Sequence, residues 1–518
     1  MLTAVILFFL GWLAKKTSDI LVRRRRNAPY PPGPLPKPFI GNCFDVPQKN
    51  AHEGYMRWGE KYKSDILYAN VLGNKVLVLN KCKDVDELLE CRARIYSDRP
   101  VIPITRLMGW SFNTGLLPYG DEWRWHRKVY HQNFHLQNIQ QYYPLQLRKV
   151  REMLKGLLQT PEDFEKHNKK LSIAIPMQIM YGYEIESIDD PCISAADNSA
   201  YIGNRLASPG ANCIDIIPAL AHIPAWFPGA SSRKTAEMVR GFTEEMQRIP
   251  MEFVKKRVSE GTAAPSLVST FLEKKNSFGA SGQEEKVIKN VAYTVYGAAS
   301  DTTNTATATF FFLMAVNPEI QTKAHQELDN VIGSDRLPDF ADRGSLPYIE
   351  AIYREVMRWR PPLAFGVPHR STEDDYYKGY FIPKGTTIFG NIWAMTHDPE
   401  VYEAPLEFKP DRFLDQNGKL NDDSRIAAFG FGRRVCPGRH LASSTVWLTI
   451  ASILATFNIE KVKDQFGNDI EIDEGYEERG LVSHKTPFKC SIKPRSATAI
   501  ELITEATSGE QDRFRSNA

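Results

Sequence analysis

One cysteine lies in a loop whose composition suits metal chemistry. The stretch FGFGRRVCPGRH, residues 429–440, places Cys436 among three glycines and three arginines. A free cysteine is most often a small buried hydrophobic residue. The alternative is a thiolate that binds a metal, with glycines that let the backbone approach the metal and an arginine that binds an anion. These residues alone leave both interpretations open.

A second candidate is a polar stretch inside an apolar helix. Residues 286–317 are predicted to form one helix of unusual length, which ends before Pro318. Asp301, Thr302 and Thr303 interrupt its apolar middle. The alternative is a polar stripe that faces solvent, but the sequence on both sides is apolar. Because buried polar groups need partners, we expect a bound ligand or water to supply them.

Two further motifs carry charges at a fixed spacing. Glu355 and Arg358 lie on one face of a helix within residues 345–362, which a proline pair ends. Downstream, Arg412 could turn this pair into a three-membered network. An exposed ion pair of this kind is common and contributes little to stability, so the spacing alone is weak evidence.

The elements that must position these residues are mostly helical. Short β-like runs at residues 65–79 and 380–389 stand among many helical patterns, and no change of composition marks a domain boundary. We therefore expect a mainly α fold with a minor β part. It comprises a single large domain, residues 43–493, and a polar tail, residues 494–518, that frays from about Glu505.

The composition excludes several classes of protein. The 518 residues are 42% hydrophobic and 25% charged, with a net charge of +3, which argues against a nucleic-acid binder that works through overall charge. Seven scattered cysteines without a CxxC pair argue against a zinc site or a disulfide framework and indicate a reducing compartment. The stretch HQNFH, residues 131–135, has the spacing of a zinc-protease helix, but Gln132 stands where the general-base glutamate is needed.

The N-terminus predicts a membrane anchor. Residues 2–14, LTAVILFFLGWLA, form an uncharged apolar run, and basic residues follow at 15–16 and 23–26. A full bilayer span needs about 20 apolar residues, so a helix on the membrane surface is the alternative. The basic cluster predicts that the body stays cytosolic. We expect residues 1–26 to form the anchor and the proline-rich residues 27–42 to be a stiff hinge.

Together and in this order, the motifs resemble those of the cytochrome P-450 superfamily of haem-thiolate monooxygenases. The resemblance covers about residues 30–493, and the anchor and hinge are similar to those of microsomal members. Stretches such as PPGPLPKPFIGN and YGAASDTTNTA are similar to fungal, particularly basidiomycete, members. Five family patterns are matched: FxxGxRxCxG (Phe429, Gly432, Arg434, Cys436, Gly438), ExxR (Glu355, Arg358), FxPxRF (Phe408, Pro410, Arg412, Phe413), WxxxR (Trp123, Arg127) and the oxygen-activation pattern at residues 298–303, where Ala299 replaces the usual glycine.

The resemblance implies a haem b cofactor. Cys436 is then the proximal thiolate ligand of the iron, and its electron density favours O–O bond cleavage. Gly432 and Gly438 let the loop pass close under the porphyrin, and Phe429 shields the sulfur from water. The residues that the resemblance aims at the haem propionates are Arg434, Trp123, Arg127 and His369.

The other motifs acquire roles by the same resemblance. On the opposite side of the haem, Asp301 and Thr302 resemble the acid–alcohol pair that delivers protons during oxygen activation. The network of Glu355, Arg358 and Arg412 is assigned to structure rather than chemistry.

Electrons have to come from a separate protein. Residues 430–435, GFGRRV, begin like a dinucleotide-binding loop but have Val435 where the third glycine is needed, and no other such loop is present. By resemblance, the partner is the membrane-bound diflavin reductase that uses NADPH. Arg433 and Arg439 are expected on the proximal surface, either solvated or as a docking site for an acidic redox partner.

The leading hypothesis is a monooxygenase of the endoplasmic reticulum membrane that inserts one oxygen atom from O2 into an organic substrate. One alternative keeps the haem-thiolate fold but rearranges or dehydrates a peroxide without a reductase. Such relatives usually lack the acid–threonine pair. The other alternative is a non-catalytic haem-binding protein, in which the distal motif would be idle.

The substrate is expected to be lipophilic, such as a fungal secondary metabolite or a foreign compound, because the candidate pocket walls are mostly apolar. These walls are residues 101–117, 201–246, 293–302, 363–367 and 481–484, with Leu363, Phe365, Leu481 and Val482 prominent.

Overall fold

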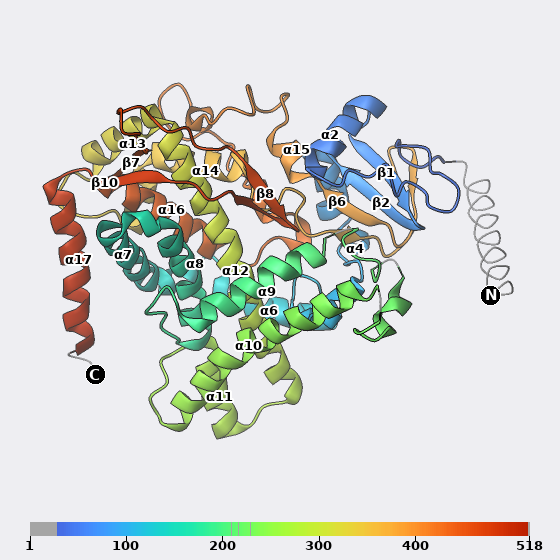
Figure 1. Ribbon diagram of the computed structural model, residues 1–518, viewed down its shortest axis with the longest axis horizontal. Helices are drawn as coiled ribbons and strands as arrows, with labels where there is room; N and C mark the ends of the chain where they lie inside the picture. Colours follow the sequence, from blue (N-terminus) through green and yellow to red (C-terminus); the bar gives the residue numbers. More distant parts are fainter. Residues whose placement is uncertain (1–27, 209, 216, 228, 516–518) are drawn as a thin grey trace. The chain divides into compact units, whose positions relative to one another are not determined.

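The computed structural model describes residues 28–208, 210–215, 217–227 and 229–515. These residues form mainly helices with a minor β part, which confirms the predicted fold class (Figure 1). They divide into two compact units. The smaller comprises residues 28–100, 365–395 and 431–433, and the larger comprises the rest. The sequence predicts no internal boundary because the two units alternate along the chain, so no single change of composition separates them.

The smaller unit contains a four-stranded sheet. Its strand order is β1 (Ile66–Val71), β2 (Asn74–Leu79), β6 (Thr387–Gly390) and β3 (His369–Arg370). β1 and β2 are antiparallel, with Ile66 opposite Leu79, whereas β2 and β6 are parallel. Leu72 and Gly73 join β1 to β2 and both have positive φ, which is the backbone of a tight hairpin turn. Both predicted β-like runs are therefore confirmed.

Short helices and a second hairpin complete the smaller unit. They are α2 (Ala51–Tyr62), α3 (Cys82–Val85), the π-helix η1 (Asp86–Cys91), α4 (Ala93–Tyr96), β4 (Asp375–Tyr377), β5 (Tyr380–Ile382) and α15 (Ile392–Thr396).

The proline-rich segment lies against this unit. As predicted, its described part, residues 28–42, contains no helix. The Pro32 carbonyl accepts a hydrogen bond from the Tyr68 N–H at 2.8 Å, and the Tyr30 ring stacks on Tyr68 with centroids 4.7 Å apart. A Cβ at Gly33 would lie 1.9 Å from the Tyr68 carbonyl oxygen, so a glycine is required there. The segment is thus a docked strap along β1 rather than a free spacer.

The larger unit is helical. Its main helices are α6 (Asp121–Phe134), α7 (Tyr143–Gln159), α8 (Phe164–Tyr181), α9 (Pro191–Leu206), α10 (Ser231–Ser259), α11 (Leu267–Phe278), α12 (Gly282–Val316), α13 (Pro318–Val331), α14 (Pro347–Trp359), α16 (Arg439–Thr456) and α17 (Ala497–Arg515). Shorter ones are α5 (Pro103–Leu107), η2 (Trp110–Phe112), η3 (Ile139–Tyr142), η4 (Pro161–Asp163), η5 (Pro218–His222), η6 (Phe340–Ser345), η7 (Pro410–Phe413) and η8 (Ala427–Phe429). The turn η9 (Gly432–Arg434) has its first two residues in the smaller unit and Arg434 in the larger.

Four strands form two antiparallel pairs in the larger unit. β8 (Tyr476–Arg479) and β9 (Val482–Lys485) make a hairpin, and β7 (Phe457–Lys461) pairs with β10 (Cys490–Pro494).

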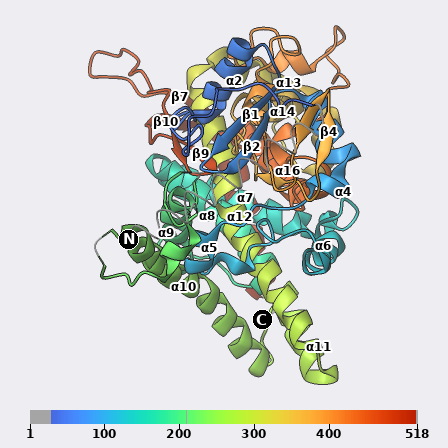
Figure 2. The same cartoon turned by 90° about the vertical axis from the view of Figure 1, so that its right-hand side faces the viewer.

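Helix α12 runs through the middle of the larger unit, where it packs against α8, α16 and β7 (Figure 2). Residues 310–315 are all buried. The prediction of one long helix is confirmed, but the helix begins at Gly282, four residues earlier than the sequence indicates. Ser281 caps it there, since its Oγ accepts a hydrogen bond from the Glu284 N–H at 3.1 Å.

The C-terminal segment differs from the predicted polar tail. It forms α17, which packs against α7 (Figure 1). Ala499 and Ile503 are one helical turn apart and are both buried. This narrow apolar stripe is enough to dock a helix whose other residues are mostly polar.

Within the described ranges, no helix is both long and apolar enough to cross a membrane. The predicted anchor, residues 1–26, lies outside the described residues.

Candidate active site

Cys436 lies in the loop that leads into α16, in the larger unit. Its backbone N–H donates to the Phe429 carbonyl at 2.8 Å and so closes the loop that carries the sulfur. A Cβ at Gly438 would have no neighbour within 4 Å, so the space beside this glycine is open to a group outside the chain. A glycine is needed at position 432 for another reason. The φ of Gly432 is +57°, and a Cβ there would lie 2.0 Å from the Leu89 carbonyl oxygen. The conformation of the backbone therefore requires Gly432, independently of any bound cofactor.

Burial and the neighbouring groups shift the pKa of the Cys436 thiol in opposite directions. Burial raises the pKa of the Cys436 thiol, whereas the Gly438 N–H and the positive charges of Arg127 and Arg439 lower it. Burial is the largest of these effects, so the chain alone favours the neutral thiol. A metal at the sulfur supplies the missing stabilisation, because a coordinating thiol loses its proton.

The two neighbouring arginines differ in exposure. Arg433 is exposed, as predicted. Arg439 is half-buried and donates to the Cys436 carbonyl oxygen at 3.3 Å, so it is a neighbour of the cysteine rather than the free surface charge that the sequence predicts.

Two of the residues predicted to face the haem propionates contact each other. The Arg434 guanidinium carbon lies 4.5 Å from the centroid of the Trp123 ring, and its Nη2 donates to the Leu117 carbonyl at 2.9 Å. Trp123 is buried at 6% exposure on α6. The indole therefore holds the guanidinium by a cation–π contact and fixes its direction.

Arg127, one helical turn after Trp123, is half-buried, and burial lowers the pKa of its guanidinium. In the part of the chain that the structure describes, no carboxylate pairs with it. A buried cation needs an anionic partner. The donor set of this region, one cysteine sulfur with guanidinium groups nearby, therefore fits a haem, which brings both a metal and two carboxylates.

His369 lies on β3 in the smaller unit. It is buried, and its Nδ1 is 2.8 Å from the Tyr96 carbonyl oxygen. Its predicted contact with a propionate stays a prediction.

The acid and the alcohol on α12 are held by different groups. Thr302 Oγ1 donates to the Ala298 carbonyl at 3.0 Å, one turn back along its own helix. Asp301 is buried at 8% exposure, and its Oδ1 lies 2.7 Å from Nε2 of His484 on β9. Successive side chains on a helix point about 100° apart, so the two groups occupy adjacent faces of α12.

Protein groups contact several residues of the polar stretch in α12, whereas the Thr305 hydroxyl is buried with no hydrogen-bond partner among the described residues. The expected ligand or water therefore stays a prediction. Ser172 on α8 donates to the Ser300 carbonyl at 2.8 Å, and the amide of Asn168 donates to the Asn304 carbonyl at 2.9 Å. Thr307 also contacts Asn168. These contacts join α12 to α8 and keep the centre of the helix in place.

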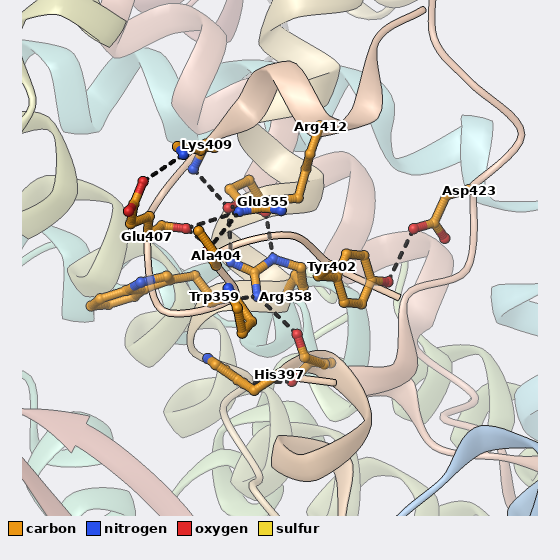
Figure 3. A network of polar contacts seen from close by, with 12 residues as sticks. Glu355, Arg358, Trp359, His397, Tyr402, Ala404, Glu407, Lys409, Arg412 and Asp423 are labelled. Atoms are coloured by element: carbon orange, nitrogen blue, oxygen red, sulfur yellow. Dashed lines mark hydrogen bonds and ion pairs between the residues drawn. The ribbon is translucent and has the colours of Figure 1, made fainter. Parts of the chain in front are cut away.

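The predicted charge network on α14 is confirmed, and it is buried (Figure 3). Glu355 has no exposed surface, and Arg358 donates to its two carboxylate oxygens at 2.6 and 2.8 Å. Arg412 adds a third hydrogen bond, from Nε to Glu355 Oε1 at 3.0 Å. Arg358 Nη1 also donates to the carbonyls of Thr396 and Pro405. The network thus ties α14 to the segment that precedes the cysteine loop.

Several predicted walls of the substrate pocket are joined by hydrogen bonds. Trp110 Nε1 donates to Thr243 Oγ1 on α10 at 3.2 Å. Thr294 on α12 accepts from the Thr114 N–H at 3.1 Å and donates to the Phe112 carbonyl at 3.2 Å. Residues 101–117 are therefore fixed to both α10 and α12.

The turn of the β8–β9 hairpin meets two more of these walls. The Ser483 N–H donates to the Pro362 carbonyl at 2.9 Å, and a Cβ at Gly480 would lie 2.1 Å from the Asn204 carbonyl oxygen. By contrast, Phe365 belongs to the smaller unit, where it packs with that unit's aromatic residues.

Sequence reasoning missed the specific role of one residue. His484 is named only as the end of a candidate pocket wall, and nothing in the sequence couples it to Asp301, 183 positions away. The only available signal in the sequence is Asp301 itself. An acidic residue inside an apolar helix is expected to be buried, and a buried acid requires a partner. Of the two histidines of HQNFH, His131 lies in the last turn of α6, and His135 is the residue that follows the helix. No group of three or more His, Cys, Asp or Glu side chains in the described ranges could hold a metal ion.

Comparison with known proteins gives a consistent result. The sequence model of the family described as Cytochrome P450 matches residues 31–492. Cytochrome P450 monooxygenase 208 of Postia placenta is 40% identical over 490 residues, which is 94% of each chain. Cytochrome P450 monooxygenase ple1 of Rhodocybe pseudopiperita is 39% identical over 93% of this chain and 92% of its own. Tryptamine 4-monooxygenase of Psilocybe cyanescens is 37% identical over 93% of this chain and 96% of its own.

Proposed function

Because this chain belongs to the cytochrome P450 family and is a haem-containing monooxygenase, we propose that it oxidises a lipophilic organic substrate with electrons from a separate diflavin reductase. One oxygen atom of O2 enters the substrate, and NADPH is the source of the electrons. The observation that carries the proposal is the position of Cys436 in an open loop beside the half-buried Arg127, which has no carboxylate partner in the described residues. When bound, haem b supplies the iron at which dioxygen is activated.

The chain's own residues divide the work. The Cys436 sulfur would bind the haem iron, and Trp123, Arg127 and Arg434 would hold the propionates. On α12, the Thr302 hydroxyl can exchange its bond to the Ala298 carbonyl for a bond to a water. That water would then be placed to deliver a proton during oxygen activation.

The reductase proposal rests on charge. Arg433, which lies in the cysteine loop, is exposed. Positive groups of this kind steer an acidic redox partner to a surface and orient it there. Since no nicotinamide or flavin loop is recognisable in the sequence, the electrons have to arrive through such a partner.

The membrane proposal places the protein on the endoplasmic reticulum, with the catalytic body facing the cytosol. The apolar run at residues 2–14 and the basic cluster at 23–26 support it. A second support is a group of exposed apolar side chains in the larger unit: Ile217 at 52%, Trp226 at 81% and Phe227 at 49% exposure. Trp and Phe are favoured where a protein surface meets lipid.

The substrate class follows from the predicted walls, which are apolar apart from a few positioned polar groups. Among the residues of these predicted walls, Val482 of β9 is buried, and Ile104 and Met108 of the α5 region belong to an apolar core cluster. A role in fungal secondary metabolism or in the oxidation of foreign compounds is consistent with the relatives, one of which is named for its action on tryptamine.

The test uses the full chain coexpressed with a fungal NADPH-dependent diflavin reductase in yeast membranes. These membranes are incubated with a panel of terpenoids, polyketides and aromatic amines under ¹⁸O2. We expect at least one product heavier by one ¹⁸O atom, formed only when both NADPH and the reductase are present. Conversion of a hydroperoxide without reductase, and no labelled product, would contradict the proposal and favour an isomerase or dehydratase.

A further inference from the structure

The contact between Asp301 and His484 joins two elements of the larger unit that are remote in sequence. Asp301 lies in the middle of α12, and His484 lies on β9. The Nε2–Oδ1 distance is 2.7 Å, and each side chain is only 12% exposed. A charge-assisted hydrogen bond this short, largely shielded from water, strongly fixes the direction of both groups.

The contact sets where the carboxylate points. Asp301 Oδ1 is held by His484, while Thr302 Oγ1 donates to the Ala298 carbonyl. Because a carboxylate can only accept in this contact, the proton between the two residues resides on Nε2 of the imidazole. His484 therefore carries the proton that lies closest to Asp301.

We propose that His484 supplies Asp301 with the proton that Asp301 then passes toward Thr302. His484 is a positioning residue in this scheme, because it acts through Asp301 and not on the reacting atoms. The inference rests on the proposed role of Asp301 and Thr302 as the acid–alcohol pair.

The hairpin that carries His484 is anchored to α12 at two further points. Tyr476 donates to Thr309 Oγ1 at 3.3 Å, and Lys485 Nζ lies 4.7 Å from the centroid of the Phe312 ring. Asp301, Thr309 and Phe312 are eight and three residues apart, which places them on one side of the helix. His484 is thus held against Asp301 by its whole hairpin.

The proton transfer balances without any other reactant than water. In the imidazolium form, His484 breaks its Nε2–H bond while Asp301 Oδ1 forms an O–H bond, and the two opposite charges neutralise each other. The neutral carboxyl turns away from the ring with the proton. Nε2 then takes up a proton from bulk solvent, which a water relays without any net change, so the net result is one proton moved from solvent to Asp301. No electron moves.

The surroundings of the imidazole contain few other charges. Glu477 lies opposite His484 in the register of β8 and is exposed, and Lys485 follows on β9 with its Nζ bonded to the carbonyls of Asp473 and Gly475. His484 Nδ1 is buried, and no hydrogen-bond partner for it is found among the described residues.

The first experiment compares two substitutions at this position. His484→Gln keeps an N–H donor for Asp301 but cannot release a proton, whereas His484→Leu removes the donor. We expect both variants to keep the carbon monoxide spectrum of the wild type. Both should form several-fold less product per NADPH consumed, release more peroxide and show a larger solvent deuterium isotope effect on product formation. His325→Gln, at a largely buried histidine on α13, is the matched control and should behave as wild type.

The result for the glutamine variant is decisive. If His484→Gln has the coupling and isotope effect of the wild type while His484→Leu is uncoupled, the imidazole only holds Asp301 in place and the proposal is overturned. If both variants are fully coupled, it is overturned as well.

A second measurement does not depend on turnover. ¹⁵N-histidine spectra of the diamagnetic ferrous carbon monoxide complex report which ring nitrogen is protonated, and the His484 signal is identified by its absence in His484→Gln. We expect the signals of an imidazolium, with both ring nitrogens protonated, and an Nε2 shift that changes in Asp301→Asn. A neutral ring, whichever nitrogen carries its proton, could not give a proton to Asp301 and would overturn the proposal.

Asp301→Asn also distinguishes the proposed role of Asp301 in proton delivery from the proposed role of His484 as the source of that proton. If this variant stays fully coupled, the proposed role of Asp301 itself fails. If it is uncoupled while His484→Gln is not, only the inference about His484 fails.

Discussion

Arg434 and Trp123 form a cation–π pair in which the guanidinium carbon lies 4.5 Å from the ring centroid. The pair joins the cysteine loop, which contains Arg434, to helix α6. One helical turn further along α6, Arg127 directs its charge at Cys436 and lowers the pKa of the thiol. The same short helix therefore serves two needs of a haem, a fixed cation for its carboxylates and a positive field at its sulfur ligand.

Replacing Arg127 should weaken haem binding. A hydrogen bond to a charged group contributes about 1.5–3 kcal/mol, so Arg127→Leu should lower haem affinity roughly tenfold or more. Arg127→Lys should retain part of it, because the charge remains but the paired N–H geometry is lost. The measurement is haem content per protein during transfer to apomyoglobin. Arg124→Leu, three residues earlier on an exposed face, should retain haem as the wild type does, and equal loss in that variant would contradict this role for Arg127.

Replacing the cysteine should remove the thiolate signature without unfolding the chain. In Cys436→Ser we expect the reduced carbon monoxide complex to lose its strongly red-shifted Soret band, and monooxygenation to disappear. Cys490→Ser, at a half-buried cysteine on β10, is the matched control and should keep the band. Retention of the red-shifted band in Cys436→Ser would mean that another group is the ligand.

The site was predictable where a motif is local in sequence. The cysteine loop, the helix of Trp123 and Arg127, and the pair of Glu355 and Arg358 are all found as predicted, because each depends on spacing within one element. Contacts between remote elements were not predictable. The partner of Asp301 is an example, since any buried histidine could have been chosen.

The fold shows the same limit. The long helix α12 was predictable because its apolar residues persist over many turns, but its first turn is polar and is fixed by the Ser281 cap. Helix α17 was not predicted because only a narrow stripe, including Ile503, meets α7. The division into two units was not predictable because it is created by long-range contacts rather than by a linker.

Removing the Thr302 hydroxyl should uncouple the reaction. Thr302→Ala removes the hydroxyl that we expect to hold a water, so haem and substrate binding should persist while product per NADPH falls several-fold and peroxide rises. A positioned proton-transfer group typically contributes about 10²–10⁴-fold to a rate. A decrease in product per NADPH that is smaller than several-fold is therefore not expected. The control is Thr322→Ala on α13, an exposed threonine whose hydroxyl makes the same bond to a carbonyl one turn back. Unchanged coupling in Thr302→Ala would show that another group delivers the proton.

Breaking the buried network at Glu355 should be strongly destabilising. Glu355→Gln keeps the shape of the side chain but leaves Arg358 and Arg412 without their carboxylate. Loss of one partner from a buried ion pair costs about 3–5 kcal/mol. The expected result is a large drop in the thermal midpoint or failure to accumulate folded holoprotein. Glu252→Gln removes an exposed partner of Arg248 on α10, where the loss should be about 0.5 kcal/mol or less. Similar effects of the two substitutions would contradict the assignment of this network to structure.

His325 on α13 should make the protein sensitive to acid. Burial, together with the nearby charge of Arg495, lowers the pKa of His325 to about 4, and Asp329 and a backbone hydrogen bond only partly oppose this. The ordinary value is about 6.5, so between pH 6.5 and 4 the unfolded chain binds a proton that the folded chain does not. The stabilisation is fully present above pH 6.5 and is lost as the pH falls toward 4.

His325→Gln should remove this dependence, because glutamine does not titrate. A difference of 2–2.5 pKa units corresponds to roughly 3 kcal/mol, and some remaining exposure of the ring reduces it toward 2 kcal/mol. The measurement is the thermal midpoint of the holoprotein at pH 7 and at pH 4.5. We expect the decrease between the two pH values to be smaller in His325→Gln than in the wild type. His131→Gln, at an exposed histidine on α6, should show the full decrease. An identical decrease in His325→Gln and in the wild type would mean that this imidazole is protonated equally in the folded and unfolded chains.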